Sequence, residues 1–340
     1  MTTLPLLPVP RLNKSLTEVG LGCWQLGSDW GEVSESTALD ILGAAYEAGI
    51  RFFDTADVYG SGRSEQVIGK FRAANDVPDL TVGTKMGRLA NPHTPEAYNL
   101  ENFRAWTDSS RRNLGVDTLD LIQLHCPPPA VYGDDRVFDA LDTLVDDGAI
   151  KAYGVSVETT EEALRAIARP GVATIQIIVN IFRQKPLAEV LPAAAAAGVG
   201  IIARVPLASG LLSGRYDVNT TFADGDHRTF NRKGEAFDVG ETFAGVPFEI
   251  GVDAAQQVQG LFRQHFANDA ELAKATTAQW ALRWILDQPG ISTVIPGARN
   301  VEQANGNAGA AALPSLPADL ADELEKIYQE QIAPHVHDRW

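Results

Sequence analysis

The sequence is poor in the features that mark secreted and membrane proteins. Only two cysteines occur among its 340 residues, Cys23 and Cys126, which is too few for a disulfide framework. No apolar run reaches the roughly 18 residues of a membrane-spanning helix, and prolines interrupt the start of the chain, where a signal-peptide core would lie. These absences predict a cytoplasmic protein with no membrane partner.

Basic residues are also in short supply. The 28 lysines and arginines are outnumbered by 44 acidic residues, and the formal net charge is −16. A protein this acidic is a poor partner for nucleic acid or for an anionic membrane surface. An anionic cofactor is still compatible with the charge, because a few local arginines and backbone amides can bind phosphate groups.

Short β-rich segments alternate with longer amphipathic helical patterns along the chain. Several of the β-rich segments are apolar almost throughout, which is typical of a parallel sheet buried on both faces. Glycines and prolines end the helical patterns. The alternation predicts one α/β domain over residues 1–340, a (β/α)8 TIM barrel. We expect strands at residues 18–21, 51–54, 80–84, 119–124, 151–155, 174–178, 200–203 and 293–295, and helices at 36–49, 100–114, 137–147, 161–168, 188–197 and 277–287.

Two segments lie outside this alternation. Residues 4–16 precede the first strand and are expected to form a hairpin that closes the floor of the barrel. Residues 207–251 form a long loop after the seventh strand and include five phenylalanines. Connections this long are usually functional or disordered, and five aromatic residues argue against disorder. We expect this segment to cover a cofactor or substrate; the alternative is a packed decoration on the rim of the barrel.

Polar residues stand where three successive strands end. Asp54 ends the second expected strand, Lys85 the third and His125 the fourth, and Tyr59 follows Asp54 in the same loop. Each residue alone has an ordinary structural explanation, such as a helix cap, a solvated lysine or a buried histidine. Active sites of parallel barrels lie at the carboxyl ends of the strands, so the coincidence indicates a catalytic site.

The chemistry of these four side chains suits the reduction of a carbonyl group. The developing alkoxide needs a proton, and a tyrosine hydroxyl can give one only if its ordinary pKa of about 10 is adjusted. A neighbouring lysine ammonium stabilises the tyrosinate, and a buried lysine in turn requires a counter-charge such as Asp54. His125 is suited to hydrogen-bond the substrate oxygen and orient it for hydride transfer.

The sequence resembles the aldo-keto reductase superfamily over nearly its whole length. The segments FFDTADVYGSGRSE, TVGTK, LDLIQLHCP, YGVSV, TIQII and VIPGARNVEQ stand in the order and spacing of that family. The segments IIARVPLASGLLSGRY and TFNRKGEAFDVGETFAGVPF are similar to its bacterial stress-protein-like branch. The resemblance implies an NAD(P)H-dependent oxidoreductase in which Tyr59 is the general acid of reduction and the general base of oxidation.

The resemblance also implies where a nicotinamide cofactor binds. NADPH is favoured, with NADH as the alternative, because Arg299 is a cation suited to a 2′-phosphate. Four positions depart from the common pattern. Val157 stands where an asparagine meets the carboxamide, Gly297 and Ala298 replace a lysine and a serine, and Arg204 is the fourth. Arg204 stands where many members have a tyrosine that stacks on the nicotinamide, and a planar guanidinium can stack in its place. The alternative is that Arg204 only pairs with an acid on the rim of the barrel. The implied cofactor-binding residues are Ser156, Gln176, Arg204, Leu207, Ser209, Gly210, Leu211, Gly297, Arg299, Gln303 and Asn307.

The substrate pocket is expected beside the first expected strand. Trp24 stands where the family often has a pocket tryptophan, and Trp30 follows it; Phe230 or Phe243 would complete an apolar cup. Such a cup accepts aldehydes, ketones and sugars alike, so the partner is a small-molecule carbonyl or alcohol substrate. The sequence does not indicate an oligomeric state.

Two alternatives to an aldo-keto reductase enzyme are considered. The same scaffold serves as a cofactor-binding regulatory subunit of channels, although the complete set of four catalytic residues argues for turnover. A metal-dependent barrel hydrolase would need several histidine and acidic ligands at the strand ends, where only His125 and Asp54 occur. We therefore expect no metal site.

Overall fold

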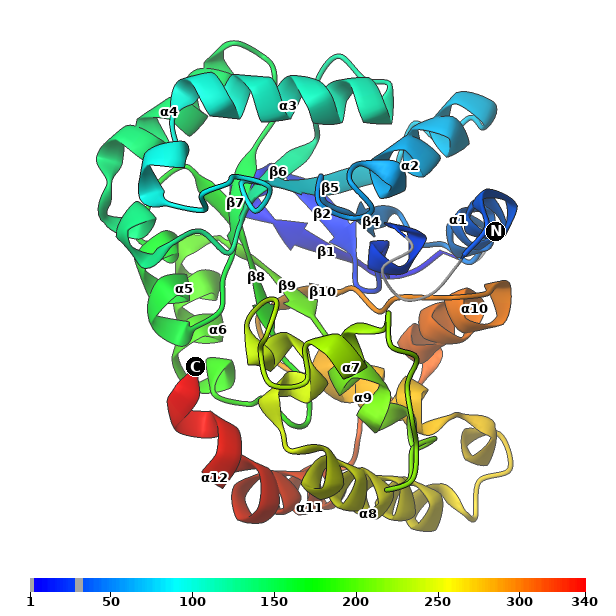
Figure 1. The fold of residues 1–340 in the computed structure, drawn as a ribbon. Helices are drawn as coiled ribbons and strands as arrows, with labels where there is room; N and C mark the ends of the chain where they lie inside the picture. The colour runs from blue at the N-terminus through cyan, green and yellow to red at the C-terminus, as the bar shows by residue number, and fades with distance from the viewer. Residues whose placement is uncertain (1–2, 28–32) are drawn as a thin grey trace.

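The computed structural model describes residues 3–27 and 33–340, and its centre is an eight-stranded parallel barrel (Figure 1). Neighbouring strands follow the order of the chain. The two ends of the sheet are joined by bridges from Val19 to Val294 and from Gly22 to Gly297. The predicted barrel fold is confirmed. Its strands are β3 (Leu21–Gly22), β4 (Phe52–Asp54), β5 (Thr81–Met86), β6 (Leu121–His125), β7 (Tyr153–Ser156), β8 (Val172–Ile178), β9 (Gly200–Arg204) and β10 (Ile291–Val294).

Burial explains why the strands are so uniformly apolar. Every residue of β4 through β10 is buried, as expected for a parallel sheet with side chains filling its interior and helices covering its outside. The polar exceptions, including Asp54, Lys85 and Gln176, are buried as well. Burying a polar group costs free energy unless the group has a hydrogen-bond or charge partner. These residues therefore indicate a polar site inside the barrel.

Helices surround the barrel, and most begin at a residue whose side chain caps the helix or end near a glycine. Asn99 caps α3 by accepting a hydrogen bond from the backbone of Asn102, and Gly115 ends that helix at a φ of +66°. The sequence pattern did not predict the helix α2, which starts after Gly62 without a side-chain cap. The helices are α1 (Glu35–Glu47), α2 (Arg63–Ala74), α3 (Leu100–Leu114), α4 (Asp135–Asp146), α5 (Thr160–Ile167), α6 (Pro186–Ala197), α7 (His227–Phe230), α8 (Phe248–Phe266), α9 (Thr277–Leu286), α10 (Val301–Gly309), α11 (Ala318–Ile327) and α12 (Ala333–Val336).

The expected hairpin closes the floor of the barrel. It consists of β1 (Leu6–Val9) and β2 (Lys14–Thr17), which pair antiparallel. Val9, Leu12 and Leu16 share a buried cluster with residues at the starts of several barrel strands, among them Phe52 and Leu121. The hairpin therefore seals the amino-terminal end of the barrel and leaves the carboxyl end as the place for a site.

The long loop after β9, residues 205–247, is packed rather than extended, and we call it the β9–α8 connection. It contains the short helix α7 and three 3-10 turns. Phe222, Phe243 and the first residue of α8, Phe248, pack against one another with ring centroids 5.0 to 5.9 Å apart. Among the described residues, no helix is both long enough and apolar enough to cross a membrane.

Candidate active site

The sheet register brings the predicted catalytic residues to the same end of the barrel. Asp54 is the last residue of β4 and pairs with Gly83 of β5. Lys85 is the penultimate residue of β5, because the strand continues to Met86, and His125 ends β6. Since these strands are adjacent and parallel, their side chains meet at the carboxyl end of the sheet.

Lys85 lies at the centre of a buried polar group. Its Nζ atom donates to Asp54 Oδ1 at 2.5 Å, to the Thr55 carbonyl oxygen at 2.9 Å and to the Tyr59 hydroxyl at 3.2 Å. The lysine side chain is fully buried, so the Asp54 carboxylate is its necessary counter-charge. Gln176 donates to the other oxygen of Asp54 at 2.7 Å. The expected contact of lysine with both tyrosine and aspartate is therefore present.

The balance of charges decides the protonation of Lys85 and Tyr59. Burial lowers the pKa of Lys85, but the carboxylate of Asp54 outweighs burial and leaves that pKa above its ordinary value. Burial raises the pKa of the Tyr59 hydroxyl, and Lys85 offsets this only in part. We expected Lys85 to bring the tyrosine pKa below its ordinary value; in the structure Tyr59 instead holds its proton across the neutral range.

His125 is a buried, neutral imidazole. Burial, together with the nearby cations Arg88 and Lys85, depresses the pKa of His125 well below its usual value. Its Nε2 atom lies 3.4 Å from Arg88 Nη1, and Nδ1 has no partner among the described residues. The Tyr59 and His125 rings meet edge to face with centroids 6.0 Å apart. The two groups are thus placed to contact one substrate oxygen.

An aromatic wall adjoins the tyrosine. Trp24 stacks on Tyr59 with ring centroids 5.9 Å apart, and it contacts His227 and Phe237 of the β9–α8 connection. Of the two phenylalanines expected to complete the cup, Phe243 packs with Phe222 and Phe248 instead. The other, Phe230, contacts Phe237 from an exposed position, and neither Phe230 nor Phe243 lines the cavity next to Tyr59. The predicted pocket residue Trp30 lies outside the described residues.

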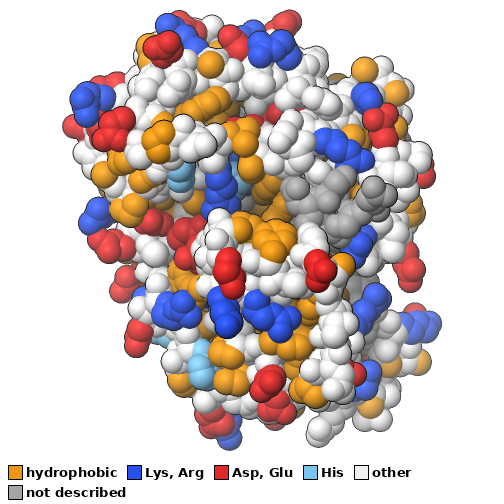
Figure 2. All heavy atoms as spheres, in the orientation of Figure 1, with side chains coloured by type: hydrophobic (Ala, Val, Ile, Leu, Met, Phe, Trp, Pro, Cys, Tyr) orange, Lys and Arg blue, Asp and Glu red, His pale blue; other side chains and the backbone are white. Residues whose placement is uncertain are grey.

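A cavity of about 900 Å³ extends from the catalytic residues along the carboxyl end of the barrel. Its volume is at the upper end for a site that binds small molecules. Figure 2 shows hydrophobic and basic side chains around a hollow near the middle of this face. Of the predicted cofactor residues, Gln176, Arg204, Leu207, Ser209, Gly210, Gly297, Arg299, Gln303 and Asn307 line the cavity. Ser156 and Leu211 are buried and do not line it.

Arg204 belongs to a largely buried group of charges that we call the ionic cluster: Arg88, Arg204, Glu158 and Glu241, of which Arg88 and Glu158 are partly exposed. Arg204 approaches Glu158 at 3.2 Å and Glu241 at 3.8 Å, and Arg88 approaches the same two acids at 3.3 and 3.0 Å. Burial raises the pKa of Glu241, but the two arginines outweigh burial and bring it to about 2. Arg204 therefore pairs with acids and also lines the cavity, and its stacking on a nicotinamide stays a prediction.

The start of the β9–α8 connection wraps around one side of the cavity. Ser209 and Gly210 have φ values of +53° and +97°. A Cβ atom on Gly210 would lie 2.3 Å from the Tyr216 hydroxyl, so glycine fits here best. The Ser209 hydroxyl donates to the Glu241 carbonyl oxygen at 3.2 Å and accepts from the Phe243 backbone at 3.0 Å. The Ser209 hydroxyl thus links the start of the β9–α8 connection to its later part. The backbone of the turn, rather than this hydroxyl, is left to contact a ligand.

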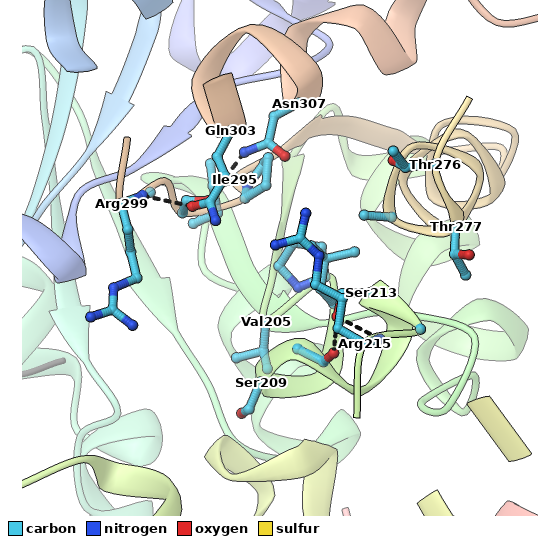
Figure 3. Close-up of a pocket in the computed structure, with 18 of the residues that line it drawn as sticks. Val205, Ser209, Ser213, Arg215, Thr276, Thr277, Ile295, Arg299, Gln303 and Asn307 are labelled. Carbon is cyan, nitrogen blue, oxygen red and sulfur yellow. Dashed lines mark hydrogen bonds between the residues drawn. The ribbon is translucent and has the colours of Figure 1, made fainter. Parts of the chain in front are cut away.

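The cavity also carries positive charge that has no acidic partner in the described part of the chain, including Arg215 and Arg299 (Figure 3). Arg299, Arg215 and Arg263 line it, and none of the three pairs with an acid among the described residues. In Figure 3 Arg215 extends from its loop toward the space between Gln303 and the Thr276–Thr277 turn. The sequence indicated only Arg299. Arg215 and Arg263 were missed because they come from the connection and from α8, whose position relative to β10 no local pattern reveals.

Gln303 and Asn307 organise the segment that follows β10. Gln303 Oε1 accepts from the Arg299 backbone at 2.8 Å, and Asn307 Nδ2 donates to the Gly297 carbonyl oxygen at 3.1 Å. A side chain on Gly297 would begin 2.2 Å from the amide of Gln25, which is the end of a flexible side chain. Gln25 would therefore have to move to admit the family's lysine at this position.

One group of potential metal ligands occurs in the described part of the chain: Cys126, Glu158 and Glu241. Both carboxylates already pair with Arg88 and Arg204, and burial strongly raises the pKa of the Cys126 thiol. A divalent cation at this point would face two arginines, and the thiol would have to lose its proton to bind. The chemistry of this group is therefore unfavourable for a metal.

Comparison with known proteins agrees with this geometry. The profile of the aldo/keto reductase family matches residues 18–329. The chain is 31% identical over 316 residues to an uncharacterised oxidoreductase of Mycobacterium tuberculosis, covering 91% of this chain and 88% of that protein. It is 26% identical to the Schizosaccharomyces pombe protein named aldo-keto reductase yakc, NADP(+), covering 94% and 89%. Glycerol dehydrogenase from Gluconobacter oxydans superposes with a TM-score of 0.75 at 26% identity, covering 98% and 96%. The chain belongs to the aldo/keto reductase family.

Proposed function

We propose that this protein is an NADPH-dependent oxidoreductase that interconverts a small carbonyl compound and its alcohol, with Tyr59 as the acid–base group. The observation that carries the proposal is the buried Asp54–Lys85–Tyr59 chain, with Lys85 Nζ 2.5 Å from the carboxylate and 3.2 Å from the hydroxyl. A bound nicotinamide cofactor supplies or accepts the hydride. Everything else in the reaction is positioning and proton transfer, which the protein's own residues provide.

The described residues fit such a cofactor. A single cavity is lined both by the catalytic residues Asp54, Tyr59 and His125 and by the three arginines Arg215, Arg263 and Arg299. In a protein with a formal net charge of −16, an unpaired cluster of arginines in one cavity favours an anionic ligand such as a cofactor phosphate. The backbone of Ser209 and Gly210 would hold the middle of the cofactor, and Arg204 and Gln176 line the end next to Tyr59.

In reduction, Tyr59 gives its proton to the carbonyl oxygen as the carbon receives hydride. The tyrosinate that remains is stabilised by the Lys85 ammonium, whose own charge is balanced by Asp54. Neutral His125 helps to hold the substrate oxygen from the other side. Trp24, which lines the cavity, excludes water and packs against the carbon skeleton. In oxidation the tyrosinate takes the proton of the alcohol.

Turnover assays with purified protein test this function. NADPH consumption would be followed with a panel of aldehydes, ketones and sugars, and NADP⁺ reduction with the matching alcohols, each with and without a chelator. We expect turnover that is insensitive to the chelator. Loss of activity on chelation would contradict a metal-free tyrosine mechanism. Tight NADPH binding without turnover of any substrate would favour the regulatory-subunit alternative.

The pKa of Tyr59 predicts opposite pH profiles for the two directions. Its folded value lies above the ordinary value, so the proton needed for reduction is present throughout the neutral range. We expect kcat/KM for reduction to be flat from about pH 6 to 9, and kcat/KM for oxidation to rise about tenfold per pH unit as tyrosinate forms. Steady-state kinetics in both directions measure this. A reduction profile that falls with an apparent pKa near 7 would contradict the expectation.

Arg299 is proposed to bind the 2′-phosphate that distinguishes NADPH from NADH. Replacing Arg299 by alanine is expected to raise KM for NADPH about 10- to 100-fold, the loss of one charge-assisted hydrogen bond. KM for NADH should change little, because NADH lacks that phosphate and serves as the internal control. Equal increases for both cofactors would place Arg299 on the pyrophosphate instead.

A further inference from the structure

Trp340 packs against the β9–α8 connection from a distant part of the chain. It follows the 3-10 turn His337–Arg339 and is only 7% exposed. Its indole N–H donates to Asp238 Oδ1 at 2.9 Å, a contact between residues 102 positions apart. A large aromatic ring that is buried together with its hydrogen-bonded N–H has one favoured position. Trp340 is therefore fixed to the connection.

The connection receives this ring between two glycines. A Cβ atom on Gly245 would lie 2.4 Å from Cη2 of the Trp340 ring, and one on Gly240 would lie 3.0 Å from its Cε2. The backbone of Gly245 also has a φ of +80°, which residues with side chains rarely adopt. The ring thus lies directly on backbone that a larger residue would block. We call residues 238–245 the tryptophan socket.

Arg183, which lies between β8 and α6, also holds the ring. Its guanidinium carbon is 3.7 Å from the centroid of the Trp340 ring, and the residue is 2% exposed. Its Nε, Nη1 and Nη2 atoms have no hydrogen-bond partner among the described residues. A cation over an aromatic ring is attracted most strongly when the ring is tryptophan and the cation is desolvated. Loss of the Trp340 ring would therefore deprive a buried arginine of a favourable contact.

The tryptophan socket also contacts the wall of the cavity. The Glu241 carbonyl oxygen accepts from the Ser209 hydroxyl at 3.2 Å, and the Phe243 backbone N–H donates to the same hydroxyl at 3.0 Å. The Glu241 carboxylate lines the cavity and lies 3.8 Å from Arg204, which lines it too. One short segment therefore contacts both Trp340 and the residues expected to bind the cofactor.

Trp340 itself does not reach a ligand in the cavity. None of residues 333–340 lines the cavity, so an effect of Trp340 on the cofactor has to pass through the tryptophan socket. Without the ring, the socket segment would leave its place for part of the time. A cofactor that binds to the Ser209 turn would then have to order this segment again, which costs affinity.

We propose, building on the NADPH-dependent function above, that Trp340 is a positioning residue for the cofactor. Docked in the tryptophan socket, it holds Glu241 and the Ser209 turn in the arrangement that binds NADPH. Coupling between two binding events is reciprocal, and each strengthens the other by the same factor. NADPH therefore stabilises the docked position of Trp340 as much as Trp340 stabilises bound NADPH.

The first measurement uses the native protein. Hydrogen exchange followed by mass spectrometry would compare the protein without cofactor and with saturating NADPH. We expect the amides of residues 333–340 to exchange about tenfold more slowly with NADPH, although this segment lies outside the cavity, and those of residues 238–245 to slow as well. A tryptophan that only fills space would give no response at residues 333–340.

Variants measure the same coupling from the other side. Trp340→Ala is expected to raise Kd for NADPH about tenfold by calorimetry, the effect of reducing the binding arrangement to about a tenth of the population. Trp340→Phe keeps a ring for Arg183 but loses the N–H that bonds Asp238, and should restore part of the affinity. Trp284→Ala removes a similarly buried tryptophan that does not line the cavity, and should leave Kd unchanged.

The outcomes are distinct. A native Kd in Trp340→Ala would overturn the proposal, and so would equal losses of affinity in Trp340→Ala and Trp284→Ala, because the effect would then be one of general stability. If Trp340→Ala does not fold, unchanged exchange of residues 333–340 when the native protein binds NADPH would overturn it. Failure of the native protein to bind NADPH at all would contradict the proposed function itself, and this is seen before any variant is made.

Discussion

Replacing Tyr59 by phenylalanine is expected to lower kcat for carbonyl reduction by about 10²- to 10⁴-fold, the usual contribution of a general acid. The hydroxyl is the group that Lys85 contacts at 3.2 Å, and the ring stacks on Trp24. Phenylalanine preserves the stacking and removes only the proton donor. KM for NADPH should therefore change little. Single-turnover kinetics, with cofactor binding measured by fluorescence, separate the two effects.

The His125→Gln variant is the matched comparison for Tyr59→Phe. A glutamine amide can still donate a hydrogen bond to the substrate oxygen, but it carries no acid–base function near neutrality. We expect a smaller loss of kcat than in Tyr59→Phe. If His125→Gln is the more damaging change and Tyr59→Phe retains near-native kcat, the acid–base group is His125 and the proposed mechanism is wrong.

Replacing Lys85 by methionine is expected to lower the free energy of unfolding by about 3–5 kcal/mol at pH 7, because it leaves Asp54 buried without its counter-charge. Burial raises the pKa of Asp54, and Lys85 opposes that shift. Without Lys85 the folded-state pKa lies further above the unfolded value of about 4. The penalty is therefore absent below that value and grows as the pH rises toward the folded-state pKa.

Urea unfolding at pH 5 and pH 7 measures this prediction. Lys85→Met should be closer to the native protein in stability at pH 5 than at pH 7. The double variant Asp54→Asn with Lys85→Met removes both charges and keeps an acceptor for Gln176, and it should be more stable than Lys85→Met at pH 7. If the single and double variants have equal stability at both pH values, the loss comes from packing and not from the unpaired carboxylate.

The fold could be predicted from the sequence because its determinants are local. Largely apolar strands such as β8 (Val172–Ile178) alternate with helices whose ends carry glycine or capping residues, and the helix at residues 100–114 was predicted with its exact bounds. The helix α2 was missed because Gly62 offers no capping side chain. Predicting where a helix begins and ends depends on capping residues, whereas predicting the barrel depends only on the alternation of strands and helices.

The candidate site was predictable where residues stand at strand ends and not where distant segments meet. Asp54, Lys85 and His125 follow from the sheet register. The neighbours that set their chemistry come from elsewhere: Arg88 reaches His125 across the end of the barrel, and Glu241 reaches Arg88 from 153 positions along the chain. Side-chain pairing over such separations leaves no periodic signal in a single sequence.

The position of Glu241 has a consequence for protein engineering. One carboxylate on the β9–α8 connection contacts Arg204, at the end of β9, and Arg88, beside the substrate end of the cavity. A connection grafted from another family member would leave the two arginines to share the single carboxylate of Glu158 unless it brought an acid to the same point. Chimeras that exchange this segment should therefore transfer Arg88, Arg204 and Glu241 as one inherited set.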